Sequence, residues 1–152
     1  MSSIEFLYRL LILLSSMGQN FEHNSNLIIM VDDELSIGSI SNIMLTNNDF
    51  KVIANYDPGI LTISEADYKI LKESNLKLTL YLEYYEYIGK KQNYYNYEIP
   101  FSPEWLDKRY IVLRIYNLNK KPYKNKYDPL SNKQPYTFEV DYPGGSMRRI
   151  TK

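Results

Sequence analysis

The sequence predicts a mainly β protein: an antiparallel β-sandwich, immunoglobulin-like or similar, of about eight strands with one or two short helices. Three observations lead to this class. Several segments alternate apolar and polar residues with the period of a half-buried strand. Turn signals recur between them, and no long helical pattern alternates with the strands. The 152 residues, 44% of them hydrophobic and 24% charged, fit one globular domain.

The N-terminus is expected to be a secretory signal peptide spanning residues 1–18, followed by a single β-sandwich domain over residues 19–152. An apolar run at residues 10–14 precedes a group of small and polar residues. Ser16 and Gly18 occupy the −3 and −1 positions of a small-x-small cleavage site. The sequence therefore predicts an exported protein, located in a periplasm or outside the cell.

Two charged residues depart from the signal-peptide pattern. Glu5 lies in the region that is normally positive, and Arg9 interrupts the apolar residues. The alternative is an amphipathic N-terminal helix that packs on the domain. Under either interpretation the apolar run is too short to cross a membrane as a helix, so no transmembrane segment is expected.

The first part of the domain is expected to contain four strand regions and one helix. The strand regions are residues 26–33, 35–45 (one strand or a pair), 49–56 and 60–63. Asp-Pro-Gly at 57–59 is a typical turn, with proline at the first central position and a glycine that tolerates positive φ. Ser64 followed by Asp67 resembles a helix-capping pattern, which predicts a short helix over residues 65–73.

The central segment, residues 76–100, predicts a β-hairpin that is unusually rich in tyrosine. Seven tyrosines fall between positions 81 and 97. Alternation directs one set of side chains toward the core: Leu76, Leu78, Leu80, Leu82 and Tyr84, with Tyr95, Tyr97 and Ile99 on the returning strand. The other set, which includes Tyr81, Tyr85, Tyr87 and Tyr94, is expected to face outward, so only part of the cluster is a surface feature.

The C-terminal part is expected to supply the remaining strands. Ser102 and Pro103 predict a single helical turn, and Trp105 is expected to close one end of the core. Strands are predicted at residues 109–118 and 136–142, with a last edge strand at 147–152. Between the first two of these lies a basic loop of about 17 residues, a length that is often functional in a compact domain.

The composition excludes several chemistries. Cysteine is absent, which removes disulfides, thiol nucleophiles and cysteine metal sites. The one histidine, His23, lies in a polar stretch that is expected to be a tail, a poor position for a general base. The sequence lacks a G-x-S-x-G elbow, a P-loop and a dinucleotide fingerprint. No metal, no cofactor and no catalytic residue is therefore assigned.

Two weaker chemical hypotheses remain. The carboxylates at 32–34 offer oxygen ligands for calcium, although adjacent acidic residues lack the alternate spacing of a compact binding loop. Glu83 or Glu86 with Glu98 across the hairpin offers the carboxylate pair of a glycosidase. Any sheet with acidic residues presents such pairs, so the chain is expected to be non-catalytic.

Charge is distributed unevenly along the chain. Residues 19–106 have a net charge of −7 and residues 107–152 a net charge of +7. One interpretation is a basic patch for an anionic partner. The other, which we favour, is that strands from the two segments lie side by side so that the signs mix, and no nucleic-acid partner is expected.

The sequence favours a role in binding, because tyrosine combines a flat ring with a hydroxyl at low entropic cost. If the strand at 109–118 neighbours the hairpin, the outward tyrosines extend into one surface. The candidate binding residues are Tyr81, Tyr85, Tyr87, Tyr94, Tyr110, Arg114 and Tyr116.

The sequence thus predicts an interaction module that binds another protein through this face or through the basic loop. The alternative is a carbohydrate-binding module that uses the same tyrosines as stacking platforms. A structural interpretation competes with both: the tyrosines form cross-strand pairs that stabilise the sheet. A codon usage rich in A and T also contributes to the number of tyrosines.

Overall fold

The computed structural model describes residues 21–73 and 77–147 and confirms the mainly β class. The predicted signal peptide and most of the predicted last strand lie outside these residues. The strands are β1 Glu22–Val31, β2 Glu34–Leu35, β3 Ile40–Thr46, β4 Lys51–Asp57, β5 Gly59–Ser64, β6 Leu78–Ile88, β7 Lys91–Phe101, β8 Ile111–Asn117, β9 Tyr136–Tyr142 and β10 Gly145–Met147. The helical segments are α2 Glu65–Glu73, the 3₁₀ helix η1 Pro103–Asp107 and α3 Lys121–Lys124.

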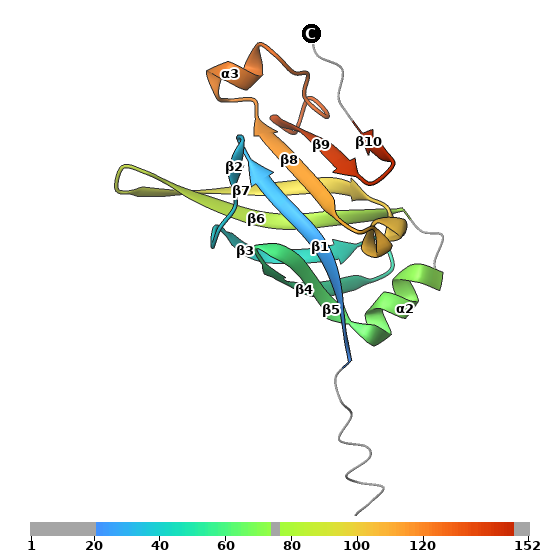
Figure 1. The fold of residues 1–152 in the computed structure, drawn as a ribbon. Helices are drawn as coiled ribbons and strands as arrows, with labels where there is room; N and C mark the ends of the chain where they lie inside the picture. Colours follow the sequence, from blue (N-terminus) through green and yellow to red (C-terminus); the bar gives the residue numbers. More distant parts are fainter. Residues whose placement is uncertain (1–20, 74–76, 148–152) are drawn as a thin grey trace, which may run out of the picture.

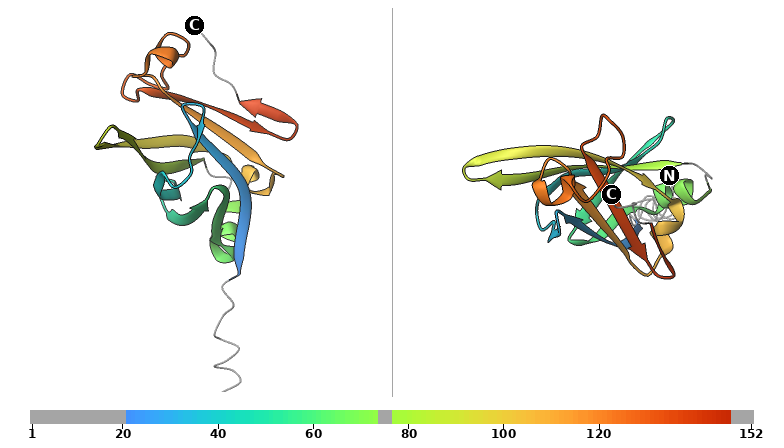
Figure 2. Two further views of the ribbon diagram at one scale, coloured as in Figure 1. Left: turned by 60° about the vertical axis from the view of Figure 1, so that its left-hand side comes forward. Right: turned by 90° about the horizontal axis from the view of Figure 1, so that it is seen from above.

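The strands form one curled, mixed sheet, a half-barrel, instead of two separate antiparallel sheets (Figures 1 and 2). Its ten strands follow the order β10-β9-β8-β1-β5-β4-β3-β6-β7, with β2 paired to β1 off this path. β1 and β8 pair in parallel, from Leu27 opposite Ile111 to Val31 opposite Ile115, and the other pairs are antiparallel. The prediction of an all-antiparallel sandwich of about eight strands is corrected on these points. Alternation reveals which face of a strand is buried, but not which strand lies beside it.

Strand β4 produces the bend in the sheet by changing partners along its length. Residues 51–54 pair with β3, whereas residues 55–57 pair with β5. A strand that changes neighbours in this way forms a corner between two parts of a β structure. The sheet consequently wraps around its own apolar face.

The core lies inside this bend, and its residues come from nearly every strand. The largest fully buried side chains are Leu27, Ile29, Val31, Leu45, Leu61, Leu71, Leu80, Leu82, Ile99, Leu113, Ile115 and Phe138. Trp105 is buried in this core, with its ring edge-on to Phe101 at 5.1 Å between centroids. The predicted inward set of the hairpin is confirmed for every member that the structure describes.

Helix α2 spans the predicted residues and begins with the predicted cap. The Asp67 amide donates to Ser64 Oγ at 3.1 Å, and that hydroxyl donates to Asp67 Oδ2 at 2.6 Å. Tyr68 and Lys72 both contact the Asp107 carboxylate of η1. The helix is thereby fixed against one end of the half-barrel.

His23 lies in β1 and not in a tail. Polar residues 22–25 extend this strand by pairing with β5, although they show no apolar alternation. The His23 ring stacks on Tyr68 at 3.7 Å, and Ser25 donates a 2.8 Å hydrogen bond to the Leu106 carbonyl. Tertiary pairing therefore sets where this strand begins, a feature that the local sequence does not indicate.

The long basic loop is folded over a small second core. It contains α3 and a short bridge between Ser131 and Gln134. Beneath it, Tyr116, Leu118 and Tyr127 are buried together. Tyr116 and Tyr127 stack with their ring centroids 4.7 Å apart.

Candidate functional site

The tyrosine-rich hairpin extends beyond the rest of the sheet. β6 and β7 pair without a register shift, from Leu78 opposite Phe101 to Ile88 opposite Lys91. Pairing of β3 with β6 ends where Ile40 lies opposite Tyr84. The far part of the hairpin is therefore a two-stranded ribbon, which stands away from the body of the molecule in both views of Figure 2.

Three of the predicted tyrosines form a cluster on the outer face of this ribbon. Tyr85, Tyr87 and Tyr94, which we call the outer tyrosine cluster, have ring centroids 6.2 Å apart in the pairs Tyr85–Tyr87 and Tyr85–Tyr94. Tyr85 is fixed by a 2.5 Å hydrogen bond to the Gly38 carbonyl. Tyr87 and Tyr94 are 66% and 65% exposed. Exposed aromatic groups held in place by a fixed neighbour are typical of interaction surfaces.

Tyr81 is on the same face but belongs to a separate hydrogen-bonded group around Glu83. Tyr81 donates to Glu83 Oε1 at 3.1 Å, and Asn42 and Ser41 donate to Oε2. The hydrogen bond from Asn42, followed by that from Tyr81, lowers the pKa of the Glu83 carboxyl. This group connects β3 to β6, so the position of Tyr81 also has a structural reason.

The other hairpin tyrosines point inward, as predicted. Tyr84, Tyr95 and Tyr97 lie on the concave side, with Tyr95 and Tyr97 stacked at 6.4 Å. Tyr136 of β9 meets Tyr97 edge-on at 4.9 Å. The prediction that alternation divides the tyrosines between the two faces is confirmed.

The Tyr97 hydroxyl is buried without a hydrogen-bond partner among the described residues. The side chain is only 2% exposed, and burial raises the pKa of this phenol far above its ordinary value. Because an unpaired buried hydroxyl is destabilising, we expect Tyr97→Phe to leave the free energy of unfolding unchanged or to raise it by about 0.5–1 kcal/mol. Tyr95→Phe, which loses a 2.7 Å bond to Glu86, is the matched control and is expected to cost about 1 kcal/mol in urea unfolding. The reverse ranking would contradict this account.

An ion-paired group that the sequence analysis missed lies at the base of the ribbon. Lys120 Nζ is 2.6 Å from Asp32 Oδ2 and 2.9 Å from Glu86 Oε2. Asp32 also accepts the Asn117 amide at 2.7 Å, and Tyr95 donates to Glu86. The group connects three segments that are distant in sequence. It also shows that the opposite charges of the two halves of the chain meet in space at this point.

Asp32 and Asp33 form the two-residue turn between β1 and β2. Both have positive φ, 54° and 65°, which aspartate tolerates better than most residues. Their carboxylates contact Lys120 and Tyr123 respectively. Among the described residues, no group of three or more histidine or acidic side chains is arranged to hold a metal ion. Glu86 lies on the inner face and Glu83 and Glu98 on the outer face, so Glu86 and Glu98 point to opposite sides of the hairpin.

One side chain connects β7, at one end of the curled sheet, to β9, the strand next to the other end. The Glu98 amide of β7 donates to the Tyr136 hydroxyl at 2.8 Å, and that hydroxyl donates to the Glu98 carbonyl at 3.1 Å. Tyr136 thus occupies the place of a neighbouring strand at a single position. We refer to this junction between β7 and β9 as the seam.

Removing the Tyr136 hydroxyl is expected to loosen the seam. Tyr136→Phe deletes both contacts to Glu98 and leaves the Glu98 amide without a hydrogen-bond partner. This should lower the free energy of unfolding by about 1.5 kcal/mol. Hydrogen exchange at the Glu98 amide should accelerate more than exchange at the Ile99 amide. Equal acceleration along β7 would show that Tyr136 does not close the seam locally.

The remaining predicted residues do not extend the outer tyrosine cluster. β8 lies between β1 and β9 and is not a neighbour of the hairpin. Arg114 pairs with Asp141 of β9. Tyr116 is buried in the second core, and Tyr110 is an exposed residue just before β8. The structure therefore brings Tyr85, Tyr87 and Tyr94 together and places Tyr110, Arg114 and Tyr116 elsewhere.

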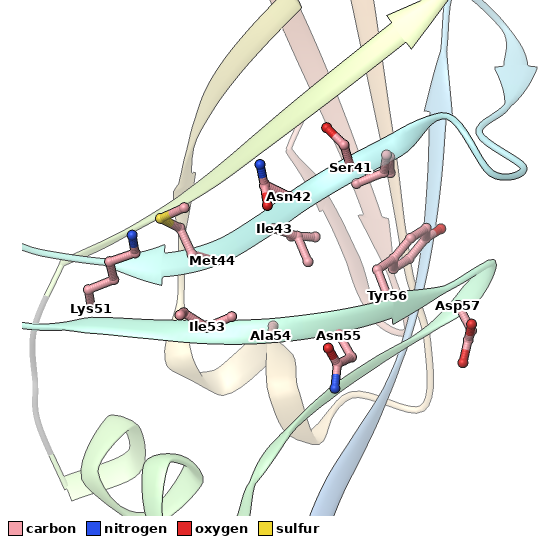
Figure 3. A pocket seen from close by; sticks show the side chains of 11 residues that line it. Ser41, Asn42, Ile43, Met44, Lys51, Ile53, Ala54, Asn55, Tyr56 and Asp57 are labelled. Carbon is pink, nitrogen blue, oxygen red and sulfur yellow. The ribbon is translucent and has the colours of Figure 1, made fainter.

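A polar hollow of about 570 Å³ opens where β3 and β4 separate. The strands are paired from Thr46 opposite Lys51 to Ile43 opposite Ala54, and beyond this point they diverge. Figure 3 shows the side chains of both strands around the opening. Tyr56, which lines the hollow, accepts hydrogen bonds from the Ile29 and Gly59 amides at 3.1 and 3.3 Å. Among the residues that the structure describes, the charged ones lining the hollow are Lys51 and Asp57, which lie at opposite ends of β4. No opposed acid and base are therefore brought together here.

No helix in the described part of the chain combines the length and apolar character needed to cross a membrane. Comparison of the chain with protein-family models, with curated proteins and with solved structures found no match.

Proposed function

We propose that this protein is a non-catalytic interaction module that binds another protein through the outer tyrosine cluster. The carrying observation is that Tyr87 and Tyr94 lie on a ribbon that projects from the body of the molecule, with Tyr85 at the base of that ribbon. Exposed tyrosine rings are enriched at protein interfaces.

The ring geometry supports a protein partner over a glycan. A sugar ring stacks best on a flat aromatic platform, but the planes of Tyr85 and Tyr87 are inclined at 88° and those of Tyr85 and Tyr94 at 49°. Inclined rings form pockets that receive side chains. Glycan binding is the alternative outcome of the test below.

The outer tyrosine cluster is also favoured over the basic loop as the contact surface. Lys120 is held by Asp32 and Glu86, and Tyr127 is buried beneath the loop. Both residues are therefore occupied in stabilising the fold. If residues 1–18 direct export, as the sequence predicts, the partner lies in the periplasm or outside the cell.

Affinity capture with matched variants tests the proposal. The wild-type protein, the double variant Tyr87→Ala/Tyr94→Ala and the control Tyr110→Ala are each used as bait in an extract of the native cells. We expect one protein to be captured by the wild type and the control and to be lost with the double variant. Capture that survives the double variant, or a glycan-array signal that depends on the same tyrosines, would contradict a protein-binding role for this face.

A further inference from the structure

Strand β7 ends the sheet, and part of its outer edge has no neighbouring strand among the described residues. The Glu98 amide and carbonyl point away from β6, because both meet Tyr136 on the other side. Main-chain groups alternate in direction along an antiparallel strand. The amides and carbonyls of Gln92, Tyr94 and Asn96 therefore also point away from β6, toward the outside of the sheet.

The edge is protected at its Glu98 end and open toward the ribbon tip. Residues 133–136 line a hollow of about 330 Å³ beside residues 94–98. The main chain of Pro100 faces outward like that of Glu98, but proline has no amide hydrogen to donate. Beside Glu98, the Tyr136 hydroxyl already takes the place of a neighbouring strand. Residues 92–96 contain no charge, no proline and no bulge. Natural proteins usually block such an edge with one of these devices. A strand is therefore able to add along residues 92–96, on the projecting ribbon.

The sequence of this edge is complementary to itself in antiparallel pairing centred on Tyr94. In this register Gln92 lies opposite Asn96 of the second copy, and the turn residue Lys90, just before β7, comes level with Glu98. Neither Lys90 nor Glu98 has an ion-pair partner in the described part of the chain. The Glu98 carboxylate has a long contact of 3.4 Å from Gln134. Opposite charges at both ends and amide side chains between them favour a second copy as the occupant.

We propose that β7 pairs with β7 of a second copy of this chain, in the register centred on Tyr94. The two hairpins then form a continuous four-stranded ribbon, and the paired main chains exchange hydrogen bonds at positions 92, 94 and 96. The twofold axis places both outer tyrosine clusters on the same face. This inference concerns the edge of β7 and not its outer face, so it stands whether or not the face binds another protein.

Charge reversal tests the register directly. Lys90→Glu alone places like charges opposite each other at both ends of the ribbon, and so does Glu98→Lys. The double variant restores opposite charges with the signs exchanged. Sedimentation velocity between about 1 and about 100 µM should show a dimer for the wild type, dissociation constants raised about tenfold for each single variant, and recovery for the double variant.

A second pair of variants tests the main-chain contact. Asn96→Pro removes an outward amide, as Pro100 already does four residues on, and should abolish the dimer while circular dichroism shows an intact fold. Asn96→Thr keeps the amide and should remain dimeric. A monomer at all concentrations would overturn the proposal. So would a dimer that is insensitive to Asn96→Pro, or one whose charge-reversed double variant is no tighter than the singles.

Discussion

Replacing Lys120 with methionine is expected to lower the free energy of unfolding by about 2 kcal/mol at neutral pH. Methionine keeps much of the apolar stem but removes the ammonium group that Asp32 and Glu86 share. The two carboxylates are mostly buried, so each loses its compensating charge. The Lys120 side chain is 35% exposed, and solvent screening reduces the loss below that of a fully buried pair.

The pH dependence of this effect follows from Glu86. Burial acts to raise the pKa of Glu86, but hydrogen bonds from Lys120 and Tyr95 outweigh it, and the pKa lies below its ordinary value of 4.5. A depressed carboxyl pKa contributes stability above the unfolded value, and that stability is lost as the pH falls through the folded value. The difference between wild type and Lys120→Met should therefore be largest near neutrality and shrink below pH 4.5.

Urea unfolding at several pH values measures both parts of this prediction. Lys121→Met is the matched control, because this neighbouring lysine is exposed in α3 and should change stability by less than about 0.5 kcal/mol. An equal loss in the two variants would contradict the role given to Lys120. If the free energy of unfolding that Lys120→Met loses does not change with pH, the role given to Glu86 is contradicted.

Leu82→Ala is expected to be the most damaging of the substitutions considered, costing about 3 kcal/mol. The Leu82 side chain is 0% exposed and lies in register between Ile43 and Tyr97. Tyr87→Ala, five residues along the same strand, removes a larger side chain from the outer face. We expect it to cost only about 0.5 kcal/mol, the contribution of a cross-strand aromatic contact.

This contrast separates the two explanations of the tyrosines. A small loss for Tyr87→Ala means that folding does not require the exposed ring, which supports a role in binding. A loss near that of Leu82→Ala would mean that the outer tyrosine cluster mainly stabilises the ribbon. Thermal or urea unfolding of both variants decides between these outcomes.

Local features of the fold were predictable from the sequence. Alternation identified the two faces of the hairpin, and the Ser64–Asp67 pair identified the start of α2. Ser102 and Pro103 marked the position of η1. In each case the determinant is a period or a cap within a few residues, so no knowledge of distant segments is needed.

The arrangement of the strands was not predictable in this way. Parallel pairing of β1 with β8 joins segments separated by six intervening strands, and no local pattern specifies it. The change of partner within β4 falls inside one continuous alternation of buried and exposed residues, so the sequence pattern does not indicate it. The candidate site was predicted in part. Alternation along the hairpin indicated that Tyr85, Tyr87 and Tyr94 face outward. The position of Arg114 relative to them depends on which strands lie beside β8, and alternation does not give this.

Site-specific photo-crosslinking in the native cells tests the central claim most directly. A photoreactive phenylalanine analogue replaces Tyr87 in one strain and Tyr110 in another, because both side chains are exposed on different parts of the molecule. We expect position 87 to form a crosslink to one other protein and position 110 to form none. Crosslinks from position 110 alone, or none from position 87 while the protein is folded and abundant, would contradict binding through the outer tyrosine cluster.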